Sequence, residues 1–192
     1  MNIRLAREIQ PDSIVDGKGI RTVIWTQGCS HNCKGCHNPD THDFNGGFLK
    51  DIDVLKEEIR SLEMQDGITL SGGDPFFQID AIYEIAKFCN EINLNVWCYT
   101  GFTFEELLKM SNKNPKIISL LSKIDVLVDG KFVEAKKSYD CKFRGSTNQR
   151  LIDVSKSLKK GEIVLYEDEN TIDFEISYRP ISLEMPCRKL YI

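Results

Sequence analysis

Strand-like and helix-like patterns of apolar residues alternate along the chain up to about residue 130. β-Branched and aromatic residues dominate 20–27, and short apolar runs follow at 68–70, 94–98 and 126–128, which predicts four strands. Between these strands, apolar residues recur at the spacing that places them on one face of a helix. The predicted helices cover 51–65, a stretch that begins at Pro75, 103–110 and 116–122.

The alternation predicts an α/β fold, because strands that alternate with helices form right-handed units around a parallel sheet. We expect a single domain over residues 1–192 with a core over about 15–155, since no repeat or interdomain linker interrupts the chain. The pattern weakens after residue 130. There, 149–154 and 162–167 resemble further strands, and the C-terminal extension 156–192 is poorly defined.

Each of the four predicted strands is followed by glycine and by polar or reactive side chains. In parallel α/β proteins, active sites gather beyond the carboxyl ends of the strands. The four loops are therefore expected to meet on one rim, around a cavity. These loops begin at Gly28, Ser71, Tyr99 and Asp129.

The loop after the first strand carries three cysteines within eight residues, Cys29, Cys33 and Cys36. Three thiolates are one fewer than a closed zinc site or a closed iron–sulfur cube requires. On a four-iron cube they would leave one iron free to bind a small molecule. Gly28 and Gly35 give the loop the backbone freedom to wrap a cluster and to point amide N–H groups at sulfur.

A structural zinc site is the alternative for this loop. His31 or His37 could supply the fourth ligand beside the three cysteines. On spacing alone, a zinc knuckle and an open iron–sulfur cluster are both consistent with the loop.

The loop after the second strand reads Ser71-Gly72-Gly73-Asp74-Pro75. The two glycines would let a ligand approach the backbone, whose carbonyls can accept hydrogen bonds from an ammonium group, and Asp74 adds negative charge. Pro75 suits the first position of the next helix. A plain strand-to-helix turn is the competing interpretation, but the cysteine loop one strand earlier favours a ligand site.

Composition limits the classes of partner. The net charge of −4, from 25 basic and 29 acidic residues, gives no general basic footprint for nucleic acid. No apolar run approaches the roughly 18 residues of a membrane span, and the N-terminal residues lack the apolar region of a secretory signal. We therefore expect a cytoplasmic protein with neither nucleic acid nor membrane as a partner, whose four other cysteines are free thiols.

The cysteine loop and the Gly-Gly-Asp-Pro run together resemble the radical S-adenosylmethionine superfamily. Within it, the chain is similar to the family of anaerobic ribonucleoside-triphosphate reductase-activating proteins over about residues 3–155. In two places the sequence departs from the superfamily: Gly35 stands where many members have an aromatic residue, and Asp74 where many have glutamate. The similar runs are 15–21, 26–29, 36–39, 41–47, 70–76 and 143–150.

The resemblance implies a fold and a chemistry. The chain is shorter than the about 250 residues of a complete TIM barrel, so a partial, open (βα) barrel of the radical S-adenosylmethionine type, with parallel strands, is expected. One 4Fe–4S cluster would be held by Cys29, Cys33 and Cys36, with S-adenosylmethionine on the open iron. Reductive cleavage would give a 5′-deoxyadenosyl radical, which makes a glycyl radical on the large reductase subunit. A low-potential donor such as a flavodoxin would supply the electron.

The resemblance also implies contacts between the strand ends and the cofactor. The methionyl ammonium group should meet the double-glycine loop, and the adenine should lie against the backbone near the third cysteine. The methionine portion or the ribose should lie near the end of the third strand. The expected cofactor contacts are Gly72, Gly73, Asp74, Gly35, Cys36, His37, Thr100 and Gly130.

Asp129 and Lys131 are the expected catalytic residues, at the strand end where the partner's glycine loop would enter. Asp129 would orient that loop, or it would only close a turn; His37 would contact the adenine, or would only position the cysteine loop. The competing functions are an activase of another glycyl-radical enzyme such as pyruvate formate-lyase, a radical enzyme for a small molecule, and a zinc module without catalysis. The runs 41–47 and 143–150 favour the reductase as partner.

Overall fold

The computed structural model describes residues 1–167 of the 192. Its strands form one sheet in the order β4-β1-β3-β5-β6-β7-β8, and β2 pairs separately with β3. The strands are β1 (Asn2–Leu5), β2 (Gln10–Ser13), β3 (Arg21–Thr26), β4 (Phe48–Asp51), β5 (Gly67–Gly72), β6 (Asn95–Tyr99), β7 (Val126–Asp129) and β8 (Arg150–Asp153).

The four central strands of the sheet are parallel. β3, β5, β6 and β7 pair in that order, with all their carboxyl ends at one edge. At both sides the pairing becomes antiparallel, because β1 runs against β3 and β4, and β8 runs against β7. In the described residues the sheet stays open between β4 and β8. The predicted α/β fold with a partial, open barrel is confirmed, but the antiparallel direction of the strands at its sides was not predicted.

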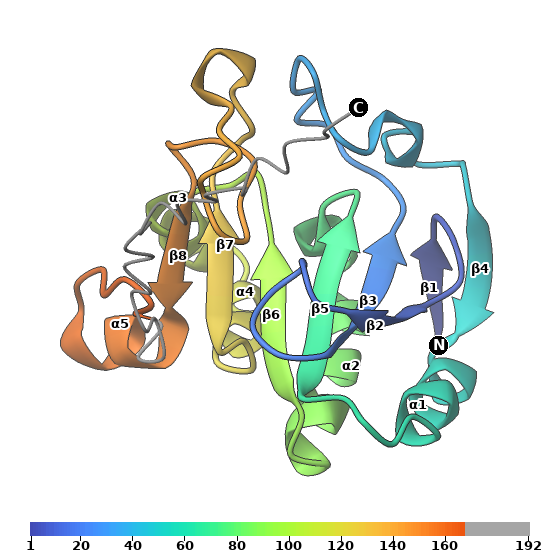
Figure 1. Ribbon diagram of the computed structural model, residues 1–192. Helices are drawn as coiled ribbons and strands as arrows, with labels where there is room; N and C mark the ends of the chain where they lie inside the picture. The colour runs from blue at the N-terminus through green and yellow to red at the C-terminus, as the bar shows by residue number, and fades with distance from the viewer. Residues whose placement is uncertain (168–192) are drawn as a thin grey trace, which may run out of the picture.

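The two faces of the sheet are covered differently. Figure 1 shows α2 (Ile79–Glu91) and α4 (Lys116–Leu121) behind the sheet, while β2 and the chain after it cross the opposite face. The helix side buries an aliphatic core that includes Ile24, Leu70 and Leu127. On the other face, the guanidinium of Arg21 lies over the ring of Trp97, and both side chains are buried. Burial on both faces explains why the central strands are short continuous apolar runs in the sequence.

Three of the described α-helices begin at a residue whose side chain accepts from one of their first N–H groups. The Asp51 carboxylate accepts from Asp53 N at the start of α1, and Thr103 forms a capping box with Glu106 at the start of α3. Pro75 opens a 3₁₀ turn, which leads into the α-helix that was predicted from this point. The helices are α1 (Ile52–Arg60), α2 (Ile79–Glu91), α3 (Phe104–Ser111), α4 (Lys116–Leu121) and α5 (Val154–Lys160), with 3₁₀ turns η1 (Pro39–Thr41), η2 (Pro75–Gln78) and η3 (Glu134–Lys136).

The predictions after residue 130 are only partly right. The strand expected at 149–154 is β8, but it ends at Asp153, whose side chain accepts from Lys156 N and starts α5. The strand expected at 162–167 is wrong, because this segment contributes only an isolated bridge between Leu165 and Ile152. Most of the extension 156–192 lies outside the described residues, so the single-domain assignment stays a prediction. No helix in the described part is long and apolar enough to cross a membrane.

Candidate active site

The loops that follow the four parallel strands meet around one cavity of about 130 Å³. Figure 1 shows the loops after β3 and after β7 beyond the same edge of the sheet. The rim expected from the sequence is therefore present. The predicted site residues that line the cavity are Cys29, Cys33, Cys36, His37, Gly72, Gly73, Asp74, Thr100, Gly130 and Lys131.

The first residues of the cysteine loop, directly after β3, form backbone hydrogen bonds with the segment that follows the loop. Gly28 N donates to Thr41 O at 2.8 Å, and Cys29 N donates to His42 O at 3.1 Å. Gly35 adopts φ 74°, a left-handed conformation that favours glycine, and it does not line the cavity. These two hydrogen bonds join the start of the loop to the segment that follows it, so the chain itself holds the loop closed.

Each of the three thiols of the loop has a backbone amide beside it. Amide hydrogen bonds to sulfur help to set the properties of an iron–sulfur cluster. Three thiols with amide donors around one cavity fit a cluster with one open iron. The amide–thiol pairs are His31 N with Cys29, Phe132 N with Cys33, and Asn38 N with Cys36 at 3.4 Å.

Burial changes the acidity of the free thiols. Desolvation raises the pKa of Cys29 to about 11, and it also raises the pKa of Cys33. In the iron-free protein these two thiols are therefore protonated at neutral pH. Ligation of a metal cluster must displace their protons.

Asp74 is the central acceptor of the site, and its side chain is buried, at 2% exposure. Its carboxylate lies 2.6 Å from His31 Nε2 and accepts from Thr100 Oγ1 and Gly101 N, both at 2.9 Å. It also accepts from Phe76 N at 2.9 Å. Asp74 and Thr100, which were expected to contact the cofactor, thus also bind each other and connect the ends of β5 and β6 to the cysteine loop.

His31, which was expected at most as a fourth zinc ligand, also lines the cavity. Its ring contacts Phe102 edge-on with 4.5 Å between centroids, and it lies 5.8 Å from Phe77. A Cβ atom on Gly101 would lie 2.4 Å from this ring. His31 therefore fixes the cysteine loop against β6, and no local signal in the sequence indicates its contact with Asp74.

The two glycines at the end of β5, Gly72 and Gly73, are required by the packing of the chain itself. Gly72 adopts φ 97°, and a Cβ atom there would lie 2.6 Å from Thr26 O. A Cβ atom on Gly73 would lie 2.5 Å from Gly28 O, which also accepts from Asp74 N at 3.0 Å. From the sequence alone, these glycines were expected to let a ligand approach the backbone. The structure adds that the start of the cysteine loop packs directly on them.

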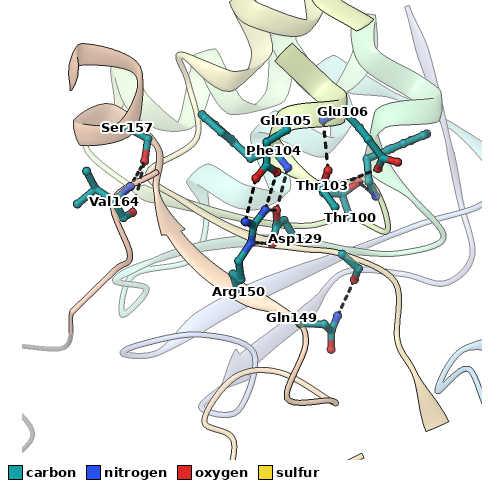
Figure 2. Close-up of polar contacts among 12 residues, drawn as sticks. Thr100, Thr103, Phe104, Glu105, Glu106, Asp129, Gln149, Arg150, Ser157 and Val164 are labelled. Carbon is teal, nitrogen blue, oxygen red and sulfur yellow. Dashed lines mark hydrogen bonds and ion pairs between the residues drawn. The ribbon is translucent and has the colours of Figure 1, made fainter. Parts of the chain in front are cut away.

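The two predicted catalytic residues lie in different surroundings. Lys131 is exposed and lines the cavity. Asp129 is buried at 1% exposure and does not line it. Its carboxylate accepts from Phe104 N at 2.8 Å and pairs with Arg150, which also binds Glu105 (Figure 2). The orienting role of Asp129 stays a prediction, and in this structure its carboxylate is already occupied.

Three thiols on the rim of a mostly parallel α/β sheet define a class of protein, one that holds a single iron–sulfur cluster at the carboxyl ends of its strands. The family described as a 4Fe-4S single cluster domain matches residues 15–152. This match confirms the 4Fe–4S prediction and decides against the zinc module.

Relatives of known name show which family the chain belongs to. The chain is 32% identical over 151 residues to the anaerobic ribonucleoside-triphosphate reductase-activating protein of Haemophilus influenzae. The aligned region covers 72% of this chain and 91% of that protein. The protein of the same name from Enterobacteria phage T4 is 33% identical over 152 residues, with 74% and 90% covered. The chain belongs to the family of anaerobic ribonucleoside-triphosphate reductase-activating proteins.

Among solved structures, QueE from Escherichia coli aligns with 53% of this chain and 53% of its own, with a TM-score of 0.46 and 14% identity.

Proposed function

We propose that this protein generates a glycyl radical on the large subunit of the anaerobic ribonucleoside-triphosphate reductase. Cys29, Cys33 and Cys36 would hold the 4Fe–4S cluster, with S-adenosylmethionine as the second cofactor. The observation that carries the proposal is the cavity itself, where these three thiols lie opposite the ends of β5, β6 and β7 in a chain of the activating-protein family.

The chemistry comes from the cofactors, and the chain supplies binding and geometry. When bound, the reduced cluster supplies the electron that cleaves S-adenosylmethionine and so produces the radical that takes a hydrogen atom from the partner's glycine. Gly72 and Gly73 line the cavity with backbone alone, which leaves room for the amino-acid end of S-adenosylmethionine. Asp74 is buried and lines the same cavity, and its carboxylate would place negative charge near the ammonium group of S-adenosylmethionine.

A second cleft supports entry of a segment of the partner. This cleft, of about 540 Å³, shares His37 and Tyr99 with the cavity. Ile14, Val15 and Tyr139 line it and are more than two-thirds exposed. An open, partly apolar cleft that adjoins the cavity of the thiols suits a glycine-bearing loop better than it suits a small polar substrate.

The remaining assignments are also proposals. Lys131, on the cavity wall, and Asp129, at the end of β7, would act where the glycine loop enters. Gly35, Cys36 and His37 would lie near the adenine. A low-potential donor such as a flavodoxin would reduce the cluster, and the enzyme would work in the cytoplasm.

The test is radical transfer to the purified reductase. Anaerobically reconstituted, reduced protein is mixed with S-adenosylmethionine and the large subunit, and the glycyl radical is measured by electron paramagnetic resonance. A radical signal that the Cys33→Ala variant does not produce supports the proposal. A signal on pyruvate formate-lyase but none on the reductase would assign the protein to a different partner.

A further inference from the structure

Three consecutive residues before and at the start of β8 bind three consecutive residues at the end of β7. Each of the three polar side chains donates a hydrogen bond to the residue across from it, so every residue of the loop 129–131 accepts one. The arginine end of this array is visible in Figure 2. The contacts are Asn148 Nδ2 with Lys131 O at 2.9 Å, Gln149 Nε2 with Gly130 O at 3.1 Å, and Arg150 Nε with Asp129 Oδ1 at 3.0 Å.

Gln149 differs from its two neighbours in this array, because it alone of the three lines the cavity. Its amide nitrogen donates to Gly130 O, as drawn in Figure 2. Its Oε1 accepts from Gly145 N at 2.9 Å and from Ser146 N at 3.1 Å. One side chain therefore joins the end of β7 to the turn at 145–146.

Both segments that Gln149 joins face the cysteine loop. A Cβ atom on Gly145 would lie 2.7 Å from the ring of His37, and that ring lies 4.8 Å from the ring of Phe132. The backbone N–H of Phe132 lies beside the sulfur of Cys33. The hydrogen bonds of Gln149 thus hold the segments that lie against the Cys33 sulfur and the His37 ring.

We infer that Gln149 is a positioning residue that fixes this wall, made of Gly130, Lys131 and Phe132 and supported by the turn at 145–146, at the distance from the cysteine loop that S-adenosylmethionine requires. The inference rests on the proposed function for the identity of the ligand. Arg150 and Asp129 anchor the wall from behind, on the side away from the cavity. Loosening the wall is expected to weaken cofactor binding without removing a cluster ligand.

Amide hydrogen exchange in the iron-free protein tests the positioning directly. Gly130 N donates to Phe102 O at 3.0 Å, so its exchange reports on the wall. Gln149→Leu should accelerate exchange at Gly130, Gly145 and Ser146 about tenfold, since each amide loses a hydrogen bond or its support. Gln149→Glu keeps the acceptor and loses the donor, so only Gly130 should accelerate. Unchanged exchange at Gly130 in both variants would overturn the inference.

Cofactor affinity provides the second readout. In reconstituted protein, the S-adenosylmethionine concentration that half-saturates the change in the cluster's paramagnetic spectrum should rise about tenfold in Gln149→Leu, at wild-type iron content. Thr147→Ala, at an exposed neighbouring position, is the matched control and should behave as wild type. If Gln149→Leu accelerates exchange at Gly130 but leaves the affinity for S-adenosylmethionine unchanged, the inference that this wall sets cofactor binding is overturned. A wild-type protein that does not respond to S-adenosylmethionine would contradict the proposed function, and the exchange experiment would still decide whether Gln149 holds the wall.

Discussion

Replacing Arg150 by leucine is expected to destabilise the iron-free protein by about 3 kcal/mol. Arg150 is the only charged partner of the Asp129 carboxylate given by the described residues, and its Nη2 lies 2.5 Å from Oδ2. Asp129 is 1% exposed, so the variant leaves a carboxylate buried with Phe104 N as its remaining hydrogen-bond donor. The hydrogen bonds to Asp129 and, next in size, to Glu105 raise the pKa of Arg150 above its ordinary value, so its guanidinium is charged at neutral pH.

The magnitude follows from burial. Removing one partner of a buried ion pair costs about 3–5 kcal/mol, because an unpaired charge is left in the interior. The Arg150 side chain is 32% exposed, so water reaches part of the space that the variant vacates and the cost falls to the lower end. Its second contact, with Glu105, is at the surface and adds less than about 1 kcal/mol.

Urea unfolding of the iron-free protein, followed by circular dichroism, measures this effect. Asp129→Asn is the matched control, since a neutral amide can still accept from Phe104 N, and it should cost about 1 kcal/mol. The double variant Asp129→Asn/Arg150→Leu should be more stable than Arg150→Leu, because it contains no unpaired carboxylate. An Arg150→Leu protein within about 0.5 kcal/mol of wild type, or a double variant less stable than Arg150→Leu, would refute the reasoning.

Three further outcomes are expected. Cys33→Ala should prevent assembly of the four-iron cluster, seen as lost iron content and lost visible absorbance; wild-type iron content would remove Cys33 from the ligand set. Gly73→Val should lower iron content as well as cofactor affinity, because its side chain would collide with Gly28 O before the first cysteine; a full cluster with only weakened cofactor binding would contradict this packing argument. The Arg150 hydrogen bond lowers the pKa of Glu105 to about 2, so this exposed acid stabilises the fold fully above its ordinary value of 4.5 and loses that contribution as pH falls towards 2. Glu105→Gln should therefore cost less than about 1 kcal/mol at pH 7 and nothing near pH 2, and a pH-independent difference in unfolding free energy would contradict it.

The parallel centre of the fold was predictable because its strands are buried on both faces. Burial of this kind leaves short apolar runs, such as those within β5 and β7, that differ plainly from the helical spacing of α2. The edge strands have no such signal. β2 is largely exposed and contains Pro11, and it is a strand only because it pairs with β3.

The candidate site likewise has a part that was predictable from the sequence and a part that was not. Its loops were predictable, since glycines and cysteines follow the strands directly in the sequence. The contacts that fix those loops were not, because they join residues far apart in the chain. His31 meets Asp74 across 43 positions, and Gln149 meets Gly130 across 19. A polar side chain acquires such a partner only when the sheet brings the two loops together.

Electron paramagnetic resonance of the reduced, reconstituted protein, with and without S-adenosylmethionine, tests the central claim most directly. The account predicts a 4Fe–4S signal that changes when S-adenosylmethionine is added, as a cluster with one open iron on Cys29, Cys33 and Cys36 requires. A signal that S-adenosylmethionine leaves unchanged, or a protein that binds zinc and no iron, would contradict it.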